Sequence, residues 1–161
     1  ACDGWPSRLV QNEVKKLTVS DFDKTFIEYG KKKNYSKKFP MKFMVHDMCI
    51  KPTKVKYDGI YALDVIEHIH PKKENKFIRN IKKSLLKNGS LIIGCPSLES
   101  QKYSPGYKKK GHINCKSASK LKTTFKKYFH NVFVFSMNDE VLHTGFYKMS
   151  QYLFLLCTNP K

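Results

Sequence analysis

The densest cluster of titratable side chains in the sequence lies between residues 64 and 70. Two carboxylates, Asp64 and Glu67, and two imidazoles, His68 and His70, share this short segment. An imidazole can act as a general base near neutral pH, and a carboxylate–histidine set can hold a divalent metal ion. A polar loop with solvated histidines could have the same composition. The cluster therefore predicts a base or a metal site, with His68 as the candidate base, or else a simple loop.

A carboxylate further upstream has the right position to contact a nucleoside. Asp21 follows an apolar run and lies 17 positions beyond Gly4. At such a distance from a glycine turn, a carboxylate can accept hydrogen bonds from ribose hydroxyls. Glycine also lets a ligand approach the backbone, so Asp3-Gly4, just before a predicted helix, is a second candidate contact. Asp21 and Asp23 could both simply cap the next helix; we assign the cap to Asp23 and the ligand to Asp21.

Asp47 occupies a comparable position, directly after the extended run of residues 41–46. Its carboxylate could accept a hydrogen bond from the exocyclic amine of a base, with Phe43 or Met48 supplying apolar contact. The alternative is a solvated acidic residue at the end of a strand.

Two later loops also contain histidine. They are Gly111-His112-Ile113-Asn114 and His143-Thr144-Gly145-Phe146, and each could line a substrate pocket or be a turn. The preceding segment, residues 103–107, reads Tyr-Ser-Pro-Gly-Tyr and is typical of a loop that could act as a lid.

The apolar residues alternate between helical and extended periodicity. We expect helices near residues 6–14, 23–33, 71–88 and 117–128, and strands near residues 17–20, 41–46, 57–63, 91–94, 131–135 and 152–157. This alternation predicts an α/β fold with a doubly wound, mostly parallel sheet, helices on both faces and an antiparallel strand near the C-terminus.

Ligands bind such sheets beyond the carboxyl ends of the strands. Three successive strands end there at an acidic residue, namely Asp21, Asp47 and Asp64.

Length and composition favour one cytoplasmic domain over residues 1–161. A chain of 161 residues with 40% hydrophobic residues can bury a core. No stretch approaches the ~18 consecutive apolar residues that a membrane-spanning helix needs. The five cysteines form no close pair, which argues against both a disulfide framework and a zinc site.

The formal charge of +18 first suggests a nucleic-acid partner, but its composition argues against one. Only Arg8 and Arg79 are arginines, so 29 of the 31 basic residues are lysines. Proteins that grip phosphates usually employ the bidentate guanidinium group. Because the lysines occur in every segment, we expect them to cover solvent-exposed faces, and we do not expect a nucleic-acid partner.

Several of these segments together form a known pattern. Residues 57–69 read Tyr-Asp-Gly-Ile-Tyr-Ala-Leu-Asp-Val-Ile-Glu-His-Ile and precede a predicted helix, the Asn88-Gly89 stop, an apolar run to Gly94, and Pro96-Ser97. With the spacing of its strand-end acids, the sequence resembles the class I S-adenosylmethionine-dependent methyltransferases, specifically the branch of the ubiquinone-biosynthesis O-methyltransferases. The resemblance covers nearly the whole chain, and the Asp-x-x-Glu-His segment is its most specific part. It implies a seven-stranded sheet with one reversed strand, and S-adenosyl-L-methionine as cofactor.

The resemblance also implies residue roles. Asp3 and Gly4 would end the glycine-rich cofactor loop, and Asp21 would bind the ribose hydroxyls. The other cofactor contacts would be Phe22 beside the adenine, Asp47 and Met48 at its amine, and Ala62 and Leu63 along the methionine part. Glu67 and His68 would face the acceptor, with His68 as catalytic base and His112 as the reserve. We expect no metal ion; in some ubiquinone-type relatives the corresponding set binds a divalent cation, which makes Asp64, Glu67 and His68 the candidate ligands.

The beginning of the sequence departs from the family pattern. The family's glycine loop follows a central strand, whereas this sequence starts inside the loop, at residues 1–4, and lacks an initiator Met. We therefore expect a truncated version of a longer chain. The expected activity is methyl transfer to the oxygen or nitrogen of a small-molecule acceptor; the alternatives are a non-catalytic methyltransferase-like subunit and a basic nucleic-acid-binding module.

Overall fold

A computed structural model describes residues 4–33, 41–139 and 141–161. Asp3, a predicted cofactor contact, lies outside these ranges. The chain forms two compact units, Ala1–Met48 and Cys49–Lys161. None of the helices in the described ranges is both long and apolar enough to cross a membrane.

The first unit is built on two parallel strands. It contains α1 (Arg8–Gln11), β1 (Leu17–Asp21), α2 (Lys24–Lys33) and β2 (Met41–Val45). Leu17 lies opposite Met41, and Asp21 lies opposite Val45, so both strands end at the same edge. The Asp23 carboxylate accepts the Thr25 N–H at 2.7 Å at the start of α2, as predicted for a helix cap.

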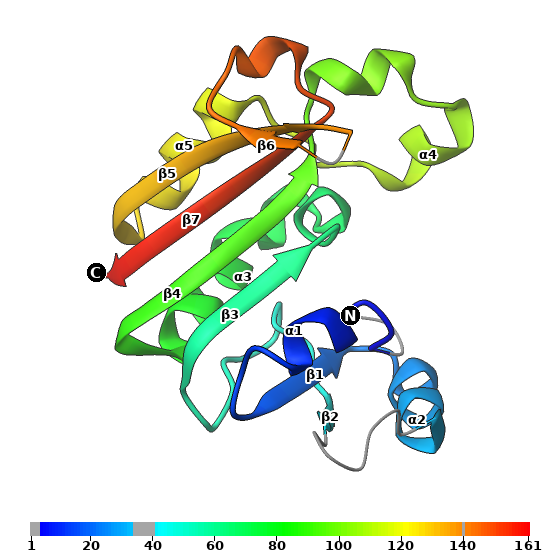
Figure 1. Ribbon diagram of the computed structural model, residues 1–161, viewed down its shortest axis with the longest axis vertical. Coiled ribbons are helices and arrows are strands. Elements are labelled where there is room, and N and C mark those ends of the chain that lie inside the picture. Colours follow the sequence, from blue (N-terminus) through cyan, green and yellow to red (C-terminus); the bar gives the residue numbers. More distant parts are fainter. Residues whose placement is uncertain (1–3, 34–40, 140) are drawn as a thin grey trace. The chain divides into compact units, whose positions relative to one another are not determined.

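The second unit contains a five-stranded sheet with the order β3-β4-β7-β5-β6 (Figure 1). The strands are β3 (Tyr57–Leu63), β4 (Leu85–Pro96), β5 (Phe129–Asn138), β6 (Val141–His143) and β7 (Tyr152–Pro160). β3 and β4 are parallel, and β7 lies between β4 and β5 and runs antiparallel to both. The predicted α/β, Rossmann-like fold with a reversed C-terminal strand is thereby confirmed. Of the described strands, β1 pairs only with β2 and β3 only with β4, so none is the central strand that the resemblance implies.

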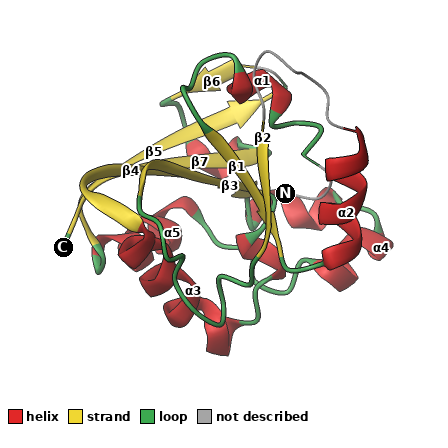
Figure 2. Cartoon of the chain, turned by 90° about the horizontal axis from the view of Figure 1, so that it is seen from below, coloured by secondary structure: helices red, strands yellow, loops and turns green. Residues whose placement is uncertain are grey.

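Two amphipathic helices cover one face of this sheet, as Figure 2 shows. They are α3 (Pro71–Ser84) and α5 (Ala118–Lys126). The covered face is fully buried at Leu91, Ile93 and Leu155, and the helices contribute Ile78 and Leu121, which are also fully buried. Burial of each such side chain contributes about 1.5–3 kcal/mol, so this layer holds the sheet in place.

The end of α3 differs from the prediction. The helix starts at Pro71 as expected, but it ends at Ser84 rather than at Asn88-Gly89. The Ser84 hydroxyl donates to the Asn80 carbonyl and accepts the Thr53 N–H, and the next residue, Leu85, already begins β4. Residues 88 and 89 instead lie where the pairing of β3 with β4 changes register, between Tyr57–Leu85 and Gly59–Ser90.

The remaining elements are short and follow strand ends. They are η1 (Ile66–His68), η2 (Glu99–Tyr103), α4 (Gly106–Gly111) and η3 (Tyr147–Met149). The segment expected to act as a lid, residues 103–107, joins η2 to α4.

Candidate active site

The chain turns sharply where β3 ends, and this turn creates the site. Asp64 has φ +53°, a left-handed conformation that Asp adopts more readily than most residues, and its N–H donates to the Gly94 carbonyl at 3.0 Å. The chain then enters η1, which carries Glu67 and His68. The predicted cluster of residues 64–70 is therefore a structured corner at the carboxyl edge of the sheet.

Glu67 is a buried carboxyl group in this corner. It has no exposed surface, and neither side-chain oxygen has a hydrogen-bond partner in the part of the chain that the structure describes. Burial raises the pKa of Glu67 from 4.5 to about 7; its own backbone N–H lowers this pKa, the charge of Asp64 raises it, and His68 lowers it. Glu67 can therefore gain or lose a proton near neutral pH.

His68 and His112 present their rings in the same manner. His68 Nδ1 lies 2.9 Å from the Gly111 carbonyl, and His112 Nδ1 lies 2.8 Å from Oε1 of Gln101. Because both oxygens are acceptors, each Nδ1 carries the proton and donates it. Each neutral ring therefore has its lone pair on Nε2. The two ring centroids are 5.1 Å apart in an edge-to-face arrangement.

The three side chains together could bind a metal ion or transfer a proton. One ligand atom each from Glu67, His68 and His112 lies within 4.8 Å of the others. Histidine ligands of metals usually donate their second ring N–H to an oxygen, which both histidines do here. Asp64, a member of the candidate ligand set, does not belong to this group, whereas His112 does.

The predicted nucleoside contacts of the first unit lie beyond its two strands. Asp21 ends β1, and its Oδ1 accepts the Asp23 N–H at 2.9 Å, which fixes the carboxylate. The His46 N–H donates to the Asp21 carbonyl at 2.8 Å and so places Asp47 and Met48 just beyond the paired strand ends. Phe22 is 75% exposed. A fixed carboxylate next to an exposed aromatic ring fits the ribose and adenine of a nucleoside cofactor.

Gly4 is in a conformation that requires glycine. Its φ is +83°, and a Cβ atom there would lie 3.1 Å from Cε1 of Phe43 and 3.4 Å from Val19. The two remaining predicted contacts, Ala62 and Leu63, end β3 in the second unit, where Leu63 is 41% exposed.

Three residues near the corner were not predicted to contribute, namely Gln101, Lys116 and Tyr152. Gln101 holds His112, and Lys116 forms an ion pair with Glu74 in α3. Asn114, in the loop that was predicted as a possible pocket lining, donates to the Ile66 carbonyl of η1. Tyr152 lies over Gly94, because a Cβ at Gly94 would approach its ring to 2.8 Å. Burial, and then the charge of Asp64, raises the pKa of the Tyr152 phenol, so its hydroxyl keeps its proton.

A cavity of about 370 Å³ lies between η2 and the segment of residues 148–151. Ser100 belongs to its wall, and the neighbouring Gln101 contacts both the Ser100 hydroxyl and His112. The volume is within the range of small-molecule sites.

Several known structures with the same fold are methyltransferases. The S-adenosylmethionine-dependent methyltransferase SibL has a TM-score of 0.75 and 10% identity over 99% of this chain, which spans only 48% of SibL. The N-methyltransferase NodS of Bradyrhizobium japonicum, in complex with S-adenosyl-L-homocysteine, has a TM-score of 0.67 and 18% identity, and the match covers 99% of this chain and 74% of NodS. A complex of a Haloferax volcanii methyltransferase activator with a putative methyltransferase has a TM-score of 0.78 and 12% identity, and the match covers 99% of this chain and 78% of the matched chain.

The fold is the one that S-adenosylmethionine-dependent methyltransferases share. Residues 1–93, more than half of the chain, match the family described as methyltransferase domain. The chain belongs to this family, for which S-adenosylmethionine is the cofactor. No curated protein sequence matches it.

Proposed function

We propose that the protein transfers a methyl group from S-adenosylmethionine to a hydroxyl oxygen or an amine nitrogen of a small-molecule acceptor. The observation that supports this proposal best is the corner formed by Glu67, His68 and His112, in which one ligand atom of each lies within 4.8 Å of the others. The cofactor, when bound, supplies an electrophilic methyl group. The residues of the chain then have to align the acceptor, exclude water and accept a proton.

His68 is the proposed base. Its Nδ1–H is held by the Gly111 carbonyl, so Nε2 is the atom that accepts the proton of the acceptor. Nε2 lies 3.8 Å from Oε1 of Glu67, whose carboxylate would stabilise the imidazolium that forms. His112 is the reserve base. A base in this position contributes about 10²–10⁴-fold to the rate.

The proposed cofactor contacts are the residues that the resemblance indicates. In the first unit, Asp21 would accept from the ribose hydroxyls, Phe22 would flank the adenine, and Asp47 with Met48 would contact its amine. Asp3 and Gly4 would end the glycine-rich cofactor loop, and Ala62 and Leu63 would lie along the methionine part.

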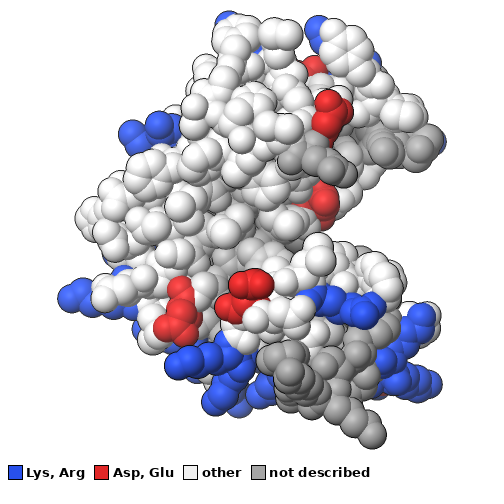
Figure 3. All heavy atoms as spheres, in the orientation of Figure 1, with Lys and Arg blue, Asp and Glu red and all other residues white. Residues whose placement is uncertain are grey.

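The cavity between η2 and residues 148–151 is the proposed acceptor site. Ser100 in its wall contacts Gln101, which holds His112. The wall includes hydroxyl, amide, carboxylate and ammonium groups. Such groups suit a polar acceptor, and O-methylation would agree with the ubiquinone-type branch that the sequence resembles. Figure 3 shows Lys and Arg side chains at the surface of the face that it draws.

The same three residues are a candidate metal centre. Glu67, His68 and His112 would hold the ion, which would lower the pKa of a coordinated acceptor hydroxyl. The paired Nδ1–H donations of the histidines favour this role. His68 would then act as a ligand instead of as the base.

The proposal is tested by following the methyl label. The protein is incubated with methyl-tritiated S-adenosylmethionine and a cell extract separated into small-molecule, protein and RNA fractions. We expect label in the small-molecule fraction, a loss of at least about 100-fold in His68→Ala, and no loss in the control His130→Ala, an exposed histidine in β5. Label confined to RNA or protein, or equal transfer by His68→Ala, would refute the proposal.

A further inference from the structure

A buried lysine lies behind the candidate active site. Lys116 is only 7% exposed, although most lysines of the chain are on the surface. Its ammonium group forms an ion pair with Oε2 of Glu74 in α3 and donates to Asn114 Oδ1 at 2.6 Å and to the Asn114 carbonyl at 3.3 Å. These three contacts match the three donors of an ammonium group. Removal of one partner would leave an uncompensated buried charge.

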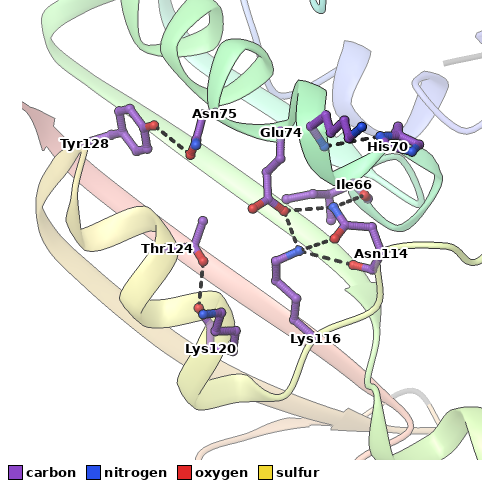
Figure 4. Close-up of polar contacts among 10 residues, drawn as sticks. Ile66, His70, Glu74, Asn75, Asn114, Lys116, Lys120, Thr124 and Tyr128 are labelled. Carbon is purple, nitrogen blue, oxygen red and sulfur yellow. Dashed lines mark hydrogen bonds and ion pairs between the residues drawn. The ribbon is translucent and has the colours of Figure 1, made fainter.

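Asn114 is the centre of this network, which Figure 4 shows. Its Nδ2 donates to Glu74 Oε2 at 2.8 Å and to the Ile66 carbonyl at 3.3 Å, while its Oδ1 accepts from Lys116. Its backbone N–H donates to the Glu67 carbonyl at 2.9 Å. All of the polar groups of this buried amide are therefore used.

The network binds the backbone on both sides of the active-site corner. The Ile66 and Glu67 carbonyls belong to η1, the turn that carries Glu67 and His68. Asn114 itself lies two residues after His112. On the other side, the Lys116 carbonyl accepts the Leu98 N–H at 3.0 Å, next to η2, which contains the Gln101 that holds His112.

We infer that Glu74, Asn114 and Lys116 position the His68–His112 pair for the proposed methyl transfer. They are positioning residues, because no side chain among them belongs to the Glu67–His68–His112 set. The catalytic part of this inference rests on the proposed function, whereas the predicted geometry of the two histidine rings does not. The network keeps the loop with His112 against η1, so that each Nδ1 stays with its oxygen acceptor.

A purely stabilising role would not need this arrangement. A buried ion pair is weak evidence for stability, since apolar side chains of similar volume often stabilise a fold as well or better. A second hydrogen bond to α3 is donated by Tyr128 Oη to Asn75 Oδ1 at 3.0 Å, and it involves neither η1 nor the loop with His112. Tyr128→Phe is therefore a matched control.

The test measures the histidine tautomers directly. Long-range ¹H–¹⁵N spectra of the imidazole rings, recorded at pH 8 without ligand, should show His68 and His112 as single Nδ1–H tautomers in the unaltered protein and in Tyr128→Phe. In Lys116→Met, the His112 signals should average between tautomers. Because this variant could fail to fold, Glu74→Met/Lys116→Met removes both charges and should remain folded by circular dichroism.

The outcomes separate this inference from the proposed function. If His112 keeps its single tautomer in the folded double variant, the positioning role is wrong. Binding of S-adenosylhomocysteine should change less than twofold in the double variant, since Asp21 does not belong to the network. If the unaltered protein does not bind S-adenosylhomocysteine, the proposed function fails, while the tautomer result still decides the positioning role.

Discussion

The Nε2 atom of His68 lies 3.8 Å from Oε1 of Glu67, and the two side chains differ sharply in their access to solvent. The His68 side chain is 48% exposed, whereas that of Glu67 has no exposed surface. When His68 takes a proton from the acceptor, its ring becomes positively charged. The Glu67 carboxylate, which water does not screen, would stabilise this charge. This pairing explains how a half-exposed imidazole could be both accessible and electrostatically supported.

The raised pKa of Glu67 predicts a pH-dependent stability. Folding raises this pKa from 4.5 to about 7, so the folded state favours the protonated form. The contribution of Glu67 protonation to the free energy of unfolding is fully present below pH 4.5 and is lost as the pH rises through about 7. Glu67→Gln does not titrate, so its stability relative to the unaltered protein should rise by about 2–3 kcal/mol between pH 5 and pH 8.

Urea unfolding in the presence of a chelator measures this difference. Glu28→Gln is the control, because Glu28 is exposed and pairs with Lys24 at the surface. Its stability relative to the unaltered protein should change little over the same range. A pH-independent difference for Glu67→Gln would show that Glu67 is ionised without cost in the folded protein.

The candidate metal centre predicts a spectroscopic signal. Co²⁺ added to the chelator-treated protein should give visible d–d absorption from a site with two imidazoles and a carboxylate. His112→Ala should weaken the binding at least tenfold, whereas His143→Ala, outside the set, should bind Co²⁺ like the unaltered protein. If His112→Ala binds Co²⁺ equally well, the site does not use this histidine.

Gly94 should not tolerate a side chain. A Cβ there would lie 2.7 Å from Leu63 Cδ2 and 2.8 Å from Tyr152 Cε1. Gly94→Ala should therefore lower the free energy of unfolding by about 1–3 kcal/mol and displace Tyr152. Gly59→Ala in β3 is the matched control, since its Cβ would meet only the Ser90 carbonyl at 4.0 Å. Equal effects of the two substitutions in thermal unfolding would show that Tyr152 adapts without cost.

The fold could be predicted because local patterns define its elements. Apolar runs predict β1 and β3, and Pro71 predicts the start of α3. The acidic residues that follow the strands are therefore predicted to lie at the carboxyl ends of the strands. The end of α3 was predicted wrongly, because Asn88-Gly89 is typical of a helix stop but serves here at a register change. Tertiary contacts of Ser84 decide that boundary, and a local pattern does not contain them.

The residues that hold the corner of the candidate active site could not be predicted from the sequence. Asn114 lies 48 positions from Ile66, and their contact depends on how the sheet is assembled. Lys116 is one of 29 lysines, and no local feature of the sequence distinguishes it from the exposed ones. Gln101 likewise becomes important only because η2 places its amide next to His112.

Calorimetric titration with S-adenosylhomocysteine tests the central claim, that the chain binds its cofactor through carboxylates beyond the strand ends. The titration compares the unaltered protein with Asp21→Ala and Asp23→Ala. We expect one site per chain, at least a tenfold loss of affinity in Asp21→Ala because charged hydrogen bonds are worth about 1.5–3 kcal/mol, and unchanged affinity in Asp23→Ala, which loses only the helix cap. Absence of binding, or equal affinity in all three proteins, would contradict the account.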